Sequence, residues 1–249
     1  MIIHNCTIVT WEDPNRVLNG YAVRIKDDRI TDISPEKDLM SLYKDEDRYD
    51  ARGQILMPGL ICAHTHFYSA FSRGLGIPGE PPADFVEILQ KLWWPLDQSL
   101  LEEDVYYSAL VSAIDAIRHG TTTVFDHHAS PNFIIGSLDA IETAVTETGI
   151  RANLCYEVTD RGGEERGEEG ITENLRMINK HRQDVPGSLV TTSFGLHAGL
   201  TLSDETLKKC RQSIPQGSGF HIHVAEHQTD EYDSMNRHGT RVVDRLDQF

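Results

Sequence analysis

The sequence predicts an α/β protein, because a stretch of short strands is followed by a regular alternation of strands and helices. Residues 1–57 contain short β-branched or alternating segments separated by turns, and the pattern changes after Met57-Pro58-Gly59. Beyond this point five apolar strands are expected, at residues 60–63, 122–125, 152–156, 189–194 and 220–224. Such alternation favours parallel strands joined by right-handed crossovers. A doubly wound sheet and a (β/α)8 barrel both fit this pattern.

Two domains are expected, a small β domain over residues 1–57 and the domain of alternating strands and helices over residues 58–249. The strands of the first domain are predicted at residues 2–10, 21–25 and 29–33. The first is β-branched and ends at a turn, Asp13-Pro14-Asn15. The second and third alternate apolar and polar residues on either side of Asp27-Asp28, which predicts a hairpin.

Amphipathic helices are expected in the second domain at residues 104–119, 137–148, 171–182, from Ser203 onward, and at 231–249. The first two end at Gly120 and Gly149, and glycine commonly terminates helices. Ser203-Asp204-Glu205 has the cap and the first-turn acids of a helix start. Residues 161–170 are rich in glycine and charge and predict a flexible loop, which could be a lid or simply a solvated loop.

The composition excludes several classes of protein. The 39 acidic against 23 basic residues give a formal net charge of −16, which argues against nucleic-acid binding. Residues 55–63 form the longest apolar stretch, far short of the ~20 residues of a membrane-spanning helix, so no membrane partner is expected. The N-terminus lacks the pattern of a secretion signal. The four cysteines have no Cys-x-x-Cys spacing, which indicates reduced thiols and a cytoplasmic location.

Histidines at the ends of two predicted strands indicate a metal site. His64 and His66 follow the first strand and point to the same side of an extended chain. His223 lies at the end of the fifth strand, and three histidines would leave a metal ion open to water. Glu226, three residues further on, is favoured as a proton carrier over a salt-bridged loop acid. His221 is interpreted as an interior residue rather than a ligand.

Other residues are candidates for the surroundings of this site. His197 ends the fourth strand and is expected to line the site. His127 and His128 are adjacent, so at most one of them can point inward, and Asp126 could accept a hydrogen bond from a ligand histidine. The aromatic residues expected in a pocket are Phe67, Tyr68 and Phe71. For Trp93-Trp94, ordinary packing is favoured over a pocket wall.

The segment Met57-Pro58-Gly59-Leu60-Ile61-Cys62-Ala63-His64-Thr65-His66 resembles the first-strand motif of the amidohydrolase superfamily. His221-Ile222-His223-Val224-Ala225-Glu226 resembles the fifth-strand motif of its aminohydrolase branch, which contains chlorohydrolases and deaminases. Leu92–Asp97, Tyr106-Tyr107-Ser108 and Asp126–Pro131 more narrowly resemble SsnA-type aminohydrolases. The superfamily commonly has Asp where this chain has Cys62.

The resemblance implies a (β/α)8 barrel that hydrolyses a non-peptide carbon–nitrogen bond. His64, His66 and His223 would be metal ligands, Glu226 would exchange protons, and His197 would contact a small-molecule substrate, an amino-substituted heterocycle. Phe67 is a further substrate contact expected from its place directly after the His pair. Zinc is the implied metal, with iron as the alternative. The complete protein is expected to be a homo-oligomer.

A single metal ion is implied, because binuclear members use a carboxylated lysine at the end of the fourth strand and this strand has none. Glu157, at the end of the third strand, is a less favoured extra ligand, as in some sugar-deacetylating members. Five β/α units cannot complete the family's barrel, which adds a His after strand six and an Asp after strand eight. We therefore expect an N-terminal fragment with part of a β-sandwich, catalytically silent and prone to association by itself. The alternative function is an inactive metal-binding or scaffold protein.

Overall fold

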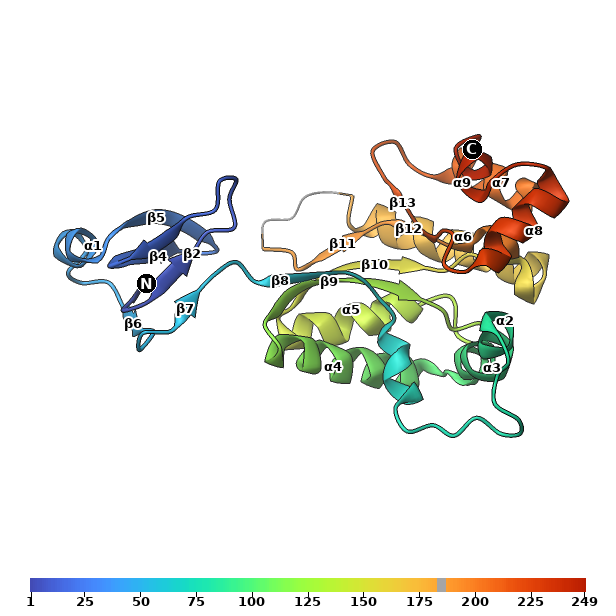
Figure 1. Cartoon of the computed structure of the whole chain (residues 1–249), viewed down its shortest axis with the longest axis horizontal. Coiled ribbons are helices and arrows are strands. Elements are labelled where there is room, and N and C mark those ends of the chain that lie inside the picture. The colour runs from blue at the N-terminus through green and yellow to red at the C-terminus, as the bar shows by residue number, and fades with distance from the viewer. Residues whose placement is uncertain (183–186) are drawn as a thin grey trace. The chain divides into compact units, whose positions relative to one another are not determined.

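The computed structural model describes residues 1–182 and 187–249 and divides the chain into two compact units, Met1–Leu60 and Ile61–Phe249 (Figure 1). In these described residues no helix combines the length and the apolar character needed to cross a bilayer. Each unit has its own hydrophobic core.

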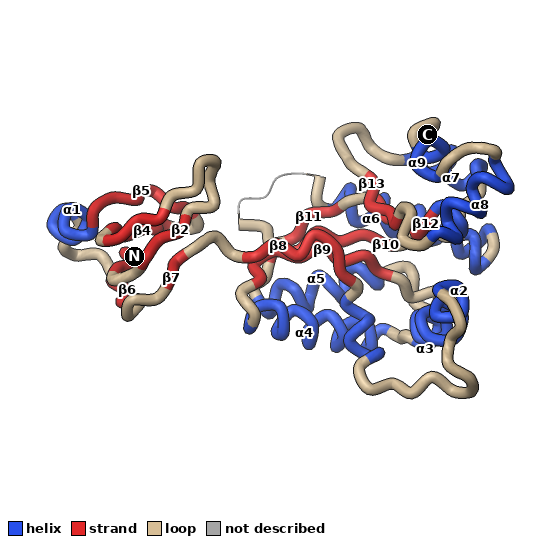
Figure 2. The backbone as a smooth tube through the Cα atoms, in the orientation of Figure 1, coloured by secondary structure: helices blue, strands red, loops and turns tan. Residues whose placement is uncertain are grey.

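The N-terminal unit consists of two small sheets with one short helix (Figure 2). One sheet has the order β5 (Arg29–Pro35), β4 (Tyr21–Lys26), β1 (Ile2–His4), β6 (Arg48–Asp50), and the other β3 (Val17–Asn19), β2 (Thr7–Val9), β7 (Ile55–Leu56). The helix is α1 (Glu36–Leu42). Cys6, Ile8 and Val23 are buried together in the core of this unit.

The expected hairpin is confirmed, because β4 and β5 pair antiparallel and Lys26 faces Arg29 across the turn. The single strand expected at residues 2–10 is wrong. Asn5 has φ = 54°, in the left-handed region, so the chain breaks there into β1 and β2, which lie in different sheets.

The second unit alternates strands and helices along the chain. In order it contains β8 (Leu60–Thr65), η1 (Phe67–Ser72), α2 (Phe85–Ile88), η2 (Leu89–Trp93), α3 (Trp94–Ser99), α4 (Glu102–Arg118), β9 (Thr121–His128), α5 (Ser137–Thr148), β10 (Arg151–Tyr156), η3 (Asp160–Gly162), α6 (Glu164–Lys180), β11 (Val190–Thr192), β12 (Phe194–Ala198), η4 (Gly199–Thr201), α7 (Asp204–Ser213), β13 (Phe220–His223), α8 (Gln228–His238) and α9 (Val242–Leu246). The expected α/β class is therefore confirmed.

Neighbouring strands of this unit follow the order of the sequence. β8, β9, β10 and β11 are adjacent in one sheet, and β12 pairs in parallel with β13. A parallel bridge between Val158 and Leu196 links the end of β10 to β12. The order of a doubly wound sheet would reverse at a switch point, whereas a barrel keeps sequential order. The topology therefore favours the barrel alternative.

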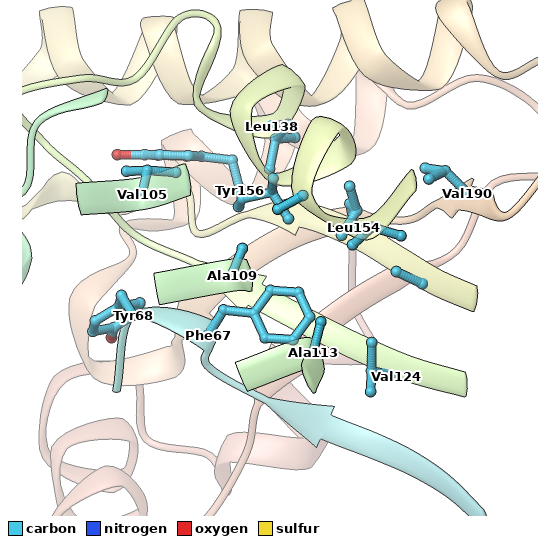
Figure 3. Close-up of a cluster of buried hydrophobic side chains, with 14 of the residues drawn as sticks. Phe67, Tyr68, Val105, Ala109, Ala113, Val124, Leu138, Leu154, Tyr156 and Val190 are labelled. Carbon is cyan, nitrogen blue, oxygen red and sulfur yellow. The ribbon is translucent and has the colours of Figure 1, made fainter. Parts of the chain in front are cut away.

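Apolar side chains of α4 and α5 pack against β9 and β10 to form the main core (Figure 3). Leu138 and Ile141 of α5 contribute from the helix side, and Val124 and Leu154 from the strands. Each of these four side chains is at most 1% exposed, and burial of one such side chain stabilises the fold by roughly 1.5–3 kcal/mol.

Three elements differ from the sequence-based expectation. The predicted loop at residues 161–170 is largely the first part of α6, because buried Gly170 and Ile171 place this turn against the strands while its acids face solvent. The last predicted helix is two helices, α8 and α9, interrupted at Gly239, where φ is 70°. The fourth strand is also split, into β11 and β12.

A buried side-chain amide joins β10 and β12 where their pairing is interrupted. Asn174 of α6 accepts the N–H groups of Tyr156 (3.0 Å) and Gly195 (3.1 Å) and donates to the carbonyl of Tyr156 (2.8 Å). A Cβ at Gly195 would collide with the carbonyl group of Tyr156, so the close approach of the two strands requires glycine. His197 lies two residues further along β12, so this contact also positions a predicted site residue.

We expect Gly195→Ala to lower the free energy of unfolding by about 1–3 kcal/mol, because the added methyl group forces two backbones apart. Gly219→Ala is the matched control, since a Cβ there meets no atom within 4 Å and Gly219 does not have a positive φ. Urea unfolding followed by circular dichroism measures both. Equal midpoints for the two variants would contradict the close approach.

Candidate metal centre

Histidines from three strands of the second unit meet at one point. His64 lies in β8, His66 directly follows it, His127 lies in β9 and His223 ends β13. One ligand nitrogen from each of these side chains lies within 4.8 Å of the other three. We call these residues the four-histidine cluster. Imidazole nitrogen suits divalent transition metals, so the cluster is a candidate metal centre.

Backbone carbonyls orient two imidazoles of the cluster. His66 Nδ1 lies 2.5 Å from the carbonyl oxygen of His127, and His223 Nδ1 lies 2.9 Å from that of His197. A carbonyl only accepts, so we assign the proton of both rings to Nδ1, which leaves a lone pair on each Nε2. These two Nε2 atoms are 3.2 Å apart. Two nitrogen ligands of a tetrahedral zinc ion lie about 3.3 Å apart, so the spacing fits one ion between them.

A third imidazole presents its nitrogen to the same point. His64 Nε2 lies 3.2 Å from His223 Nε2, and His64 Nδ1 lies 2.9 Å from His221 Nε2. His221 Nδ1 in turn faces the Cys155 sulfur at 3.7 Å. Protons on both Nδ1 atoms satisfy the contacts of His64 with His221 and of His221 with Cys155, so His64 also turns an Nε2 lone pair toward the centre. His221 is the hydrogen-bond acceptor that orients His64.

The cluster is held in the neutral form that binds metal. Burial, with a further contribution from His223, lowers the pKa of His66 to about 3. Burial and nearby His64 lower the pKa of His223 to about 4, and burial also lowers the pKa of His64. Neutral imidazole is the ligand form, so no proton has to leave these rings near pH 7 before an ion binds.

A buried carboxylate lies beside the cluster. Glu157, only 2% exposed, has its Oε1 atom 3.3 Å from Nδ1 of His66 and 3.3 Å from Nδ1 of His127. Within the described residues this Oε1 atom has no hydrogen-bond partner. Burial raises the pKa of Glu157 well above its usual value.

A cavity next to the cluster combines aromatic walls with polar groups. The lining side chains are His66, Tyr68, Phe85, Leu89, Trp93, Trp94, Asp97, Glu157, Arg161, His197, His223 and Glu226. Both tryptophans therefore border the cavity, although ordinary packing was the favoured interpretation of this pair. Sites for small molecules typically have such apolar walls with a few convergent polar groups.

His197 and Glu226, predicted as substrate-contacting and proton-carrying residues, both line this cavity. His197 is 8% exposed, and its Nδ1 atom lies 2.6 Å from the hydroxyl of Thr201. Burial lowers the pKa of His197 well below its usual value, so it is a neutral hydrogen-bonding group. Glu226 is exposed, and partial burial together with Asp230 raises the pKa of its carboxyl group.

Four of the residues predicted around the site do not line this cavity: Phe67, Phe71, Asp126 and His128. Phe67 is buried in the hydrophobic core (Figure 3), where apolar side chains from α4 surround it, and Tyr68 borders the cavity instead. Asp126 accepts the backbone N–H of Phe67 (2.7 Å) rather than a histidine proton. His128 bonds through Nε2 to the Ser130 hydroxyl (2.9 Å), on the opposite side of β9 from the cluster residue His127.

Adjacency in sequence does not decide which of His127 and His128 points inward. The pleat of β9 could have indicated it, since successive side chains alternate between the two faces of a strand. Val124 belongs to the core under the helices, so His128 shares its face and His127 lies on the other one.

The sequential parallel strands and the histidine cluster at their ends define an α/β domain with a candidate metal centre. Residues 55–248 match the Amidohydrolase family, so the chain belongs to this family and the resemblance noted in the sequence is confirmed. Family membership and the cluster together support a divalent metal ion.

Relatives of the chain are deaminases. It is 31% identical to the 5'-deoxyadenosine deaminase of Methanosarcina mazei over 248 residues, which are 99% of this chain and 54% of the relative. It is 34% identical to the 5'-deoxyadenosine deaminase of Methanobrevibacter smithii over 227 residues, 90% of this chain and 48% of the relative. The chain thus spans about half the length of the curated relatives it matches.

Solved structures share the fold at low sequence identity. Escherichia coli guanine deaminase matches with a TM-score of 0.82 and 17% identity, over 99% of this chain and 59% of the other. A zinc-bound adenosine deaminase from Xanthomonas campestris matches with a TM-score of 0.74 and 23% identity, over 99% and 55%. These similarities confirm the amidohydrolase type of fold.

Asp97 and Arg161 form a buried ion pair at the cavity, and the loss of one partner should destabilise the protein. Asp97, 1% exposed, accepts a hydrogen bond from Arg161 (2.9 Å), and burial raises the pKa of Asp97 despite this partner. Removal of Arg161 by Arg161→Gln leaves a buried charge unpaired, so we expect a loss of about 3–5 kcal/mol in the free energy of unfolding. The double variant Asp97→Asn/Arg161→Gln should recover most of this loss.

The loss should also depend on pH. A native pKa above the unfolded value means that the native state binds the Asp97 proton more tightly, so stability falls as pH rises through this range. Urea unfolding at pH 5 and pH 8 should therefore show a larger defect in Arg161→Gln at pH 8. A pH-independent defect that the second substitution does not relieve would show that the pair acts only through packing.

Proposed function

We propose that the protein is a metal-dependent aminohydrolase that hydrolyses a non-peptide carbon–nitrogen bond. The observation that carries this proposal is the convergence of three Nε2 lone pairs, with Nε2 of His64 and Nε2 of His66 each 3.2 Å from Nε2 of His223. Such lone pairs repel one another unless a cation lies between them, and an imidazole set favours zinc, with iron as the alternative.

In this proposal a bound divalent ion lowers the pKa of water and polarises the substrate. Different residues of the chain would bind the metal, transfer the proton and position the substrate. His64, His66 and His223 hold the ion, with their orientation set by His221 and by the carbonyls of His127 and His197. Glu226 moves a proton at its carboxylate, since its raised pKa brings it closer to neutral pH. His197, neutral and buried, positions the substrate through a ring nitrogen.

The proposed substrate is a small amino-substituted heterocycle. The cavity walls formed by Tyr68, Phe85, Trp93 and Trp94 suit a flat ring, because aromatic side chains stack on planar groups. Relatives in two methanogens are 5'-deoxyadenosine deaminases, which makes purine nucleosides the first compounds to assay.

The organisation of the complete protein is also a proposal. Residues 1–57 would form part of a β-sandwich, and residues 58–249 the first five units of a (β/α)8 barrel. The sequential strand order of the second unit and the match over about half of each deaminase support this division. Assembly into a homo-oligomer and the narrower likeness to SsnA-type enzymes remain predictions from sequence.

The metal set predicts that the protein binds one zinc ion per chain. His64→Ala and His223→Ala should each weaken zinc binding by more than 10-fold, because each removes a converging nitrogen. His119→Ala is the matched control, since this histidine is exposed on the end of α4. Calorimetric titration of the metal-free protein measures all four affinities. Unchanged zinc affinity in both cluster variants would contradict the ligand assignment.

The role of Glu226 predicts that Glu226→Gln keeps zinc but loses turnover, since glutamine preserves size but carries no proton. Where the zinc-loaded protein releases ammonia from amino-substituted purines, pyrimidines or triazines, the rate should fall at least about 100-fold. Glu205→Gln, at the start of α7, is the control. A near-normal rate in Glu226→Gln would remove this residue from the mechanism.

The same assay separates the two functions. Zinc binding without ammonia release by the wild-type chain would favour the alternative function, an inactive metal-binding or scaffold protein.

A further inference from the structure

We propose that His127 is a fourth imidazole ligand of the ion at the four-histidine cluster in the substrate-free chain. This inference rests on the proposed metal site, but it concerns a residue outside the three ligands expected from the family motifs. It makes β9, and not only β8 and β13, a metal-binding strand.

The first support is the burial of an unsatisfied side chain. His127 is 0% exposed, and within the described part of the chain neither of its ring nitrogens has a hydrogen-bond partner. A buried polar group without a partner costs about 1–3 kcal/mol, so buried imidazoles normally find one. The adjacent His128 is equally buried but bonds to Ser130. Among the described residues His128 keeps one unpartnered ring nitrogen, Nδ1, whereas His127 has two, so a ligand would relieve the larger cost at His127.

The second support is the position of His127 next to the other three histidines. A nitrogen of His127 lies within 4.8 Å of the ligand atoms of the other three histidines. Its ring centroid is 4.6 Å from that of His223 and 5.6 Å from those of His64 and His66. The ring also stacks on His221 at 4.5 Å with an interplanar angle of 12°, which limits its rotation. The side chain is thus held among the three expected ligands.

Glu157 provides the reason for its orientation. The Oε1 atom of Glu157 lies 3.3 Å from Nδ1 of His127, close to hydrogen-bond distance. A proton on Nδ1 that faces this carboxylate leaves the lone pair on Nε2 for an ion. Metal-binding histidines commonly donate their second ring nitrogen to a carboxylate in this way. Glu157 is therefore a positioning residue for His127 in this proposal.

A fourth imidazole changes the coordination of the ion. Three protein ligands leave one position of a tetrahedral ion open to water, whereas with four protein ligands water has to enter as a fifth ligand or displace His127. The wild-type chain and a variant without His127 should therefore differ in coordination, independently of any turnover. Cobalt(II) is a suitable probe, because its visible absorption depends on coordination number, and zinc can then be measured by competition.

The experiment titrates the metal-free 249-residue chain and three variants, His127→Gln, His128→Gln and His64→Ala, with cobalt(II) and then zinc. Wild type should give the strong absorption of a four-coordinate ion. In His127→Gln water would take the place of the imidazole, so the position and intensity of this absorption should change, and the dissociation constant for zinc should rise at least about 10-fold. His128→Gln removes an equally buried histidine from the same strand outside the cluster and should retain the wild-type spectrum.

Zinc X-ray absorption of the wild-type chain counts imidazole ligands directly and keeps the test decisive if His127→Gln fails to fold. Four imidazoles are expected, and three would overturn the proposal. Identical spectra and affinities for wild type and a folded His127→Gln would also overturn it, while the three-histidine site would stand. A wild-type chain that binds neither cobalt nor zinc would contradict the proposed function itself.

Discussion

Two hydrogen bonds from imidazole Nδ1 atoms to strand carbonyls organise the candidate centre. His66 donates to the carbonyl of His127 and His223 to that of His197, so each ring is oriented by the backbone of another strand. Because a carbonyl cannot donate, these contacts also decide which nitrogen carries the proton. The direction of the Nε2 lone pairs therefore depends on the strand positions and not on the rotamers of the histidines alone.

The carbonyl of His197 is in turn placed by packing at some distance from the centre. Asn174 of α6 ties the backbone of Tyr156 to that of Gly195, and the missing side chain of Gly195 lets the two strands come close. The parallel bridge between Val158 and Leu196 continues the contact toward His197. A buried amide on a helix thus helps to hold a site on the other side of the sheet, and the interruption between β11 and β12 has a structural role.

The centre carries an unusual balance of charge. Its histidines are held in the neutral form, while the carboxyl group of Glu157 is buried and has a raised pKa. Without a cation such an arrangement leaves lone pairs facing one another and a carboxylate oxygen unpaired, which is costly in a protein interior. A bound divalent ion would satisfy these groups together. The polar interior is therefore most simply understood as built around a positive charge.

The sequence by itself determined the α/β class, the hairpin and the family, because periodicity and the His64-Thr65-His66 motif are local properties of the chain. Local patterns could not decide the interruption at Asn5 or the start of α6 at Glu164. The first depends on the left-handed backbone of Asn5, and the second on the close packing of Gly170 against Tyr156. Likewise, only the tertiary structure brought His127 to the cluster and Phe67 into the core. Both outcomes depend on which face of an element meets its neighbours, and that is set by packing between segments far apart in sequence.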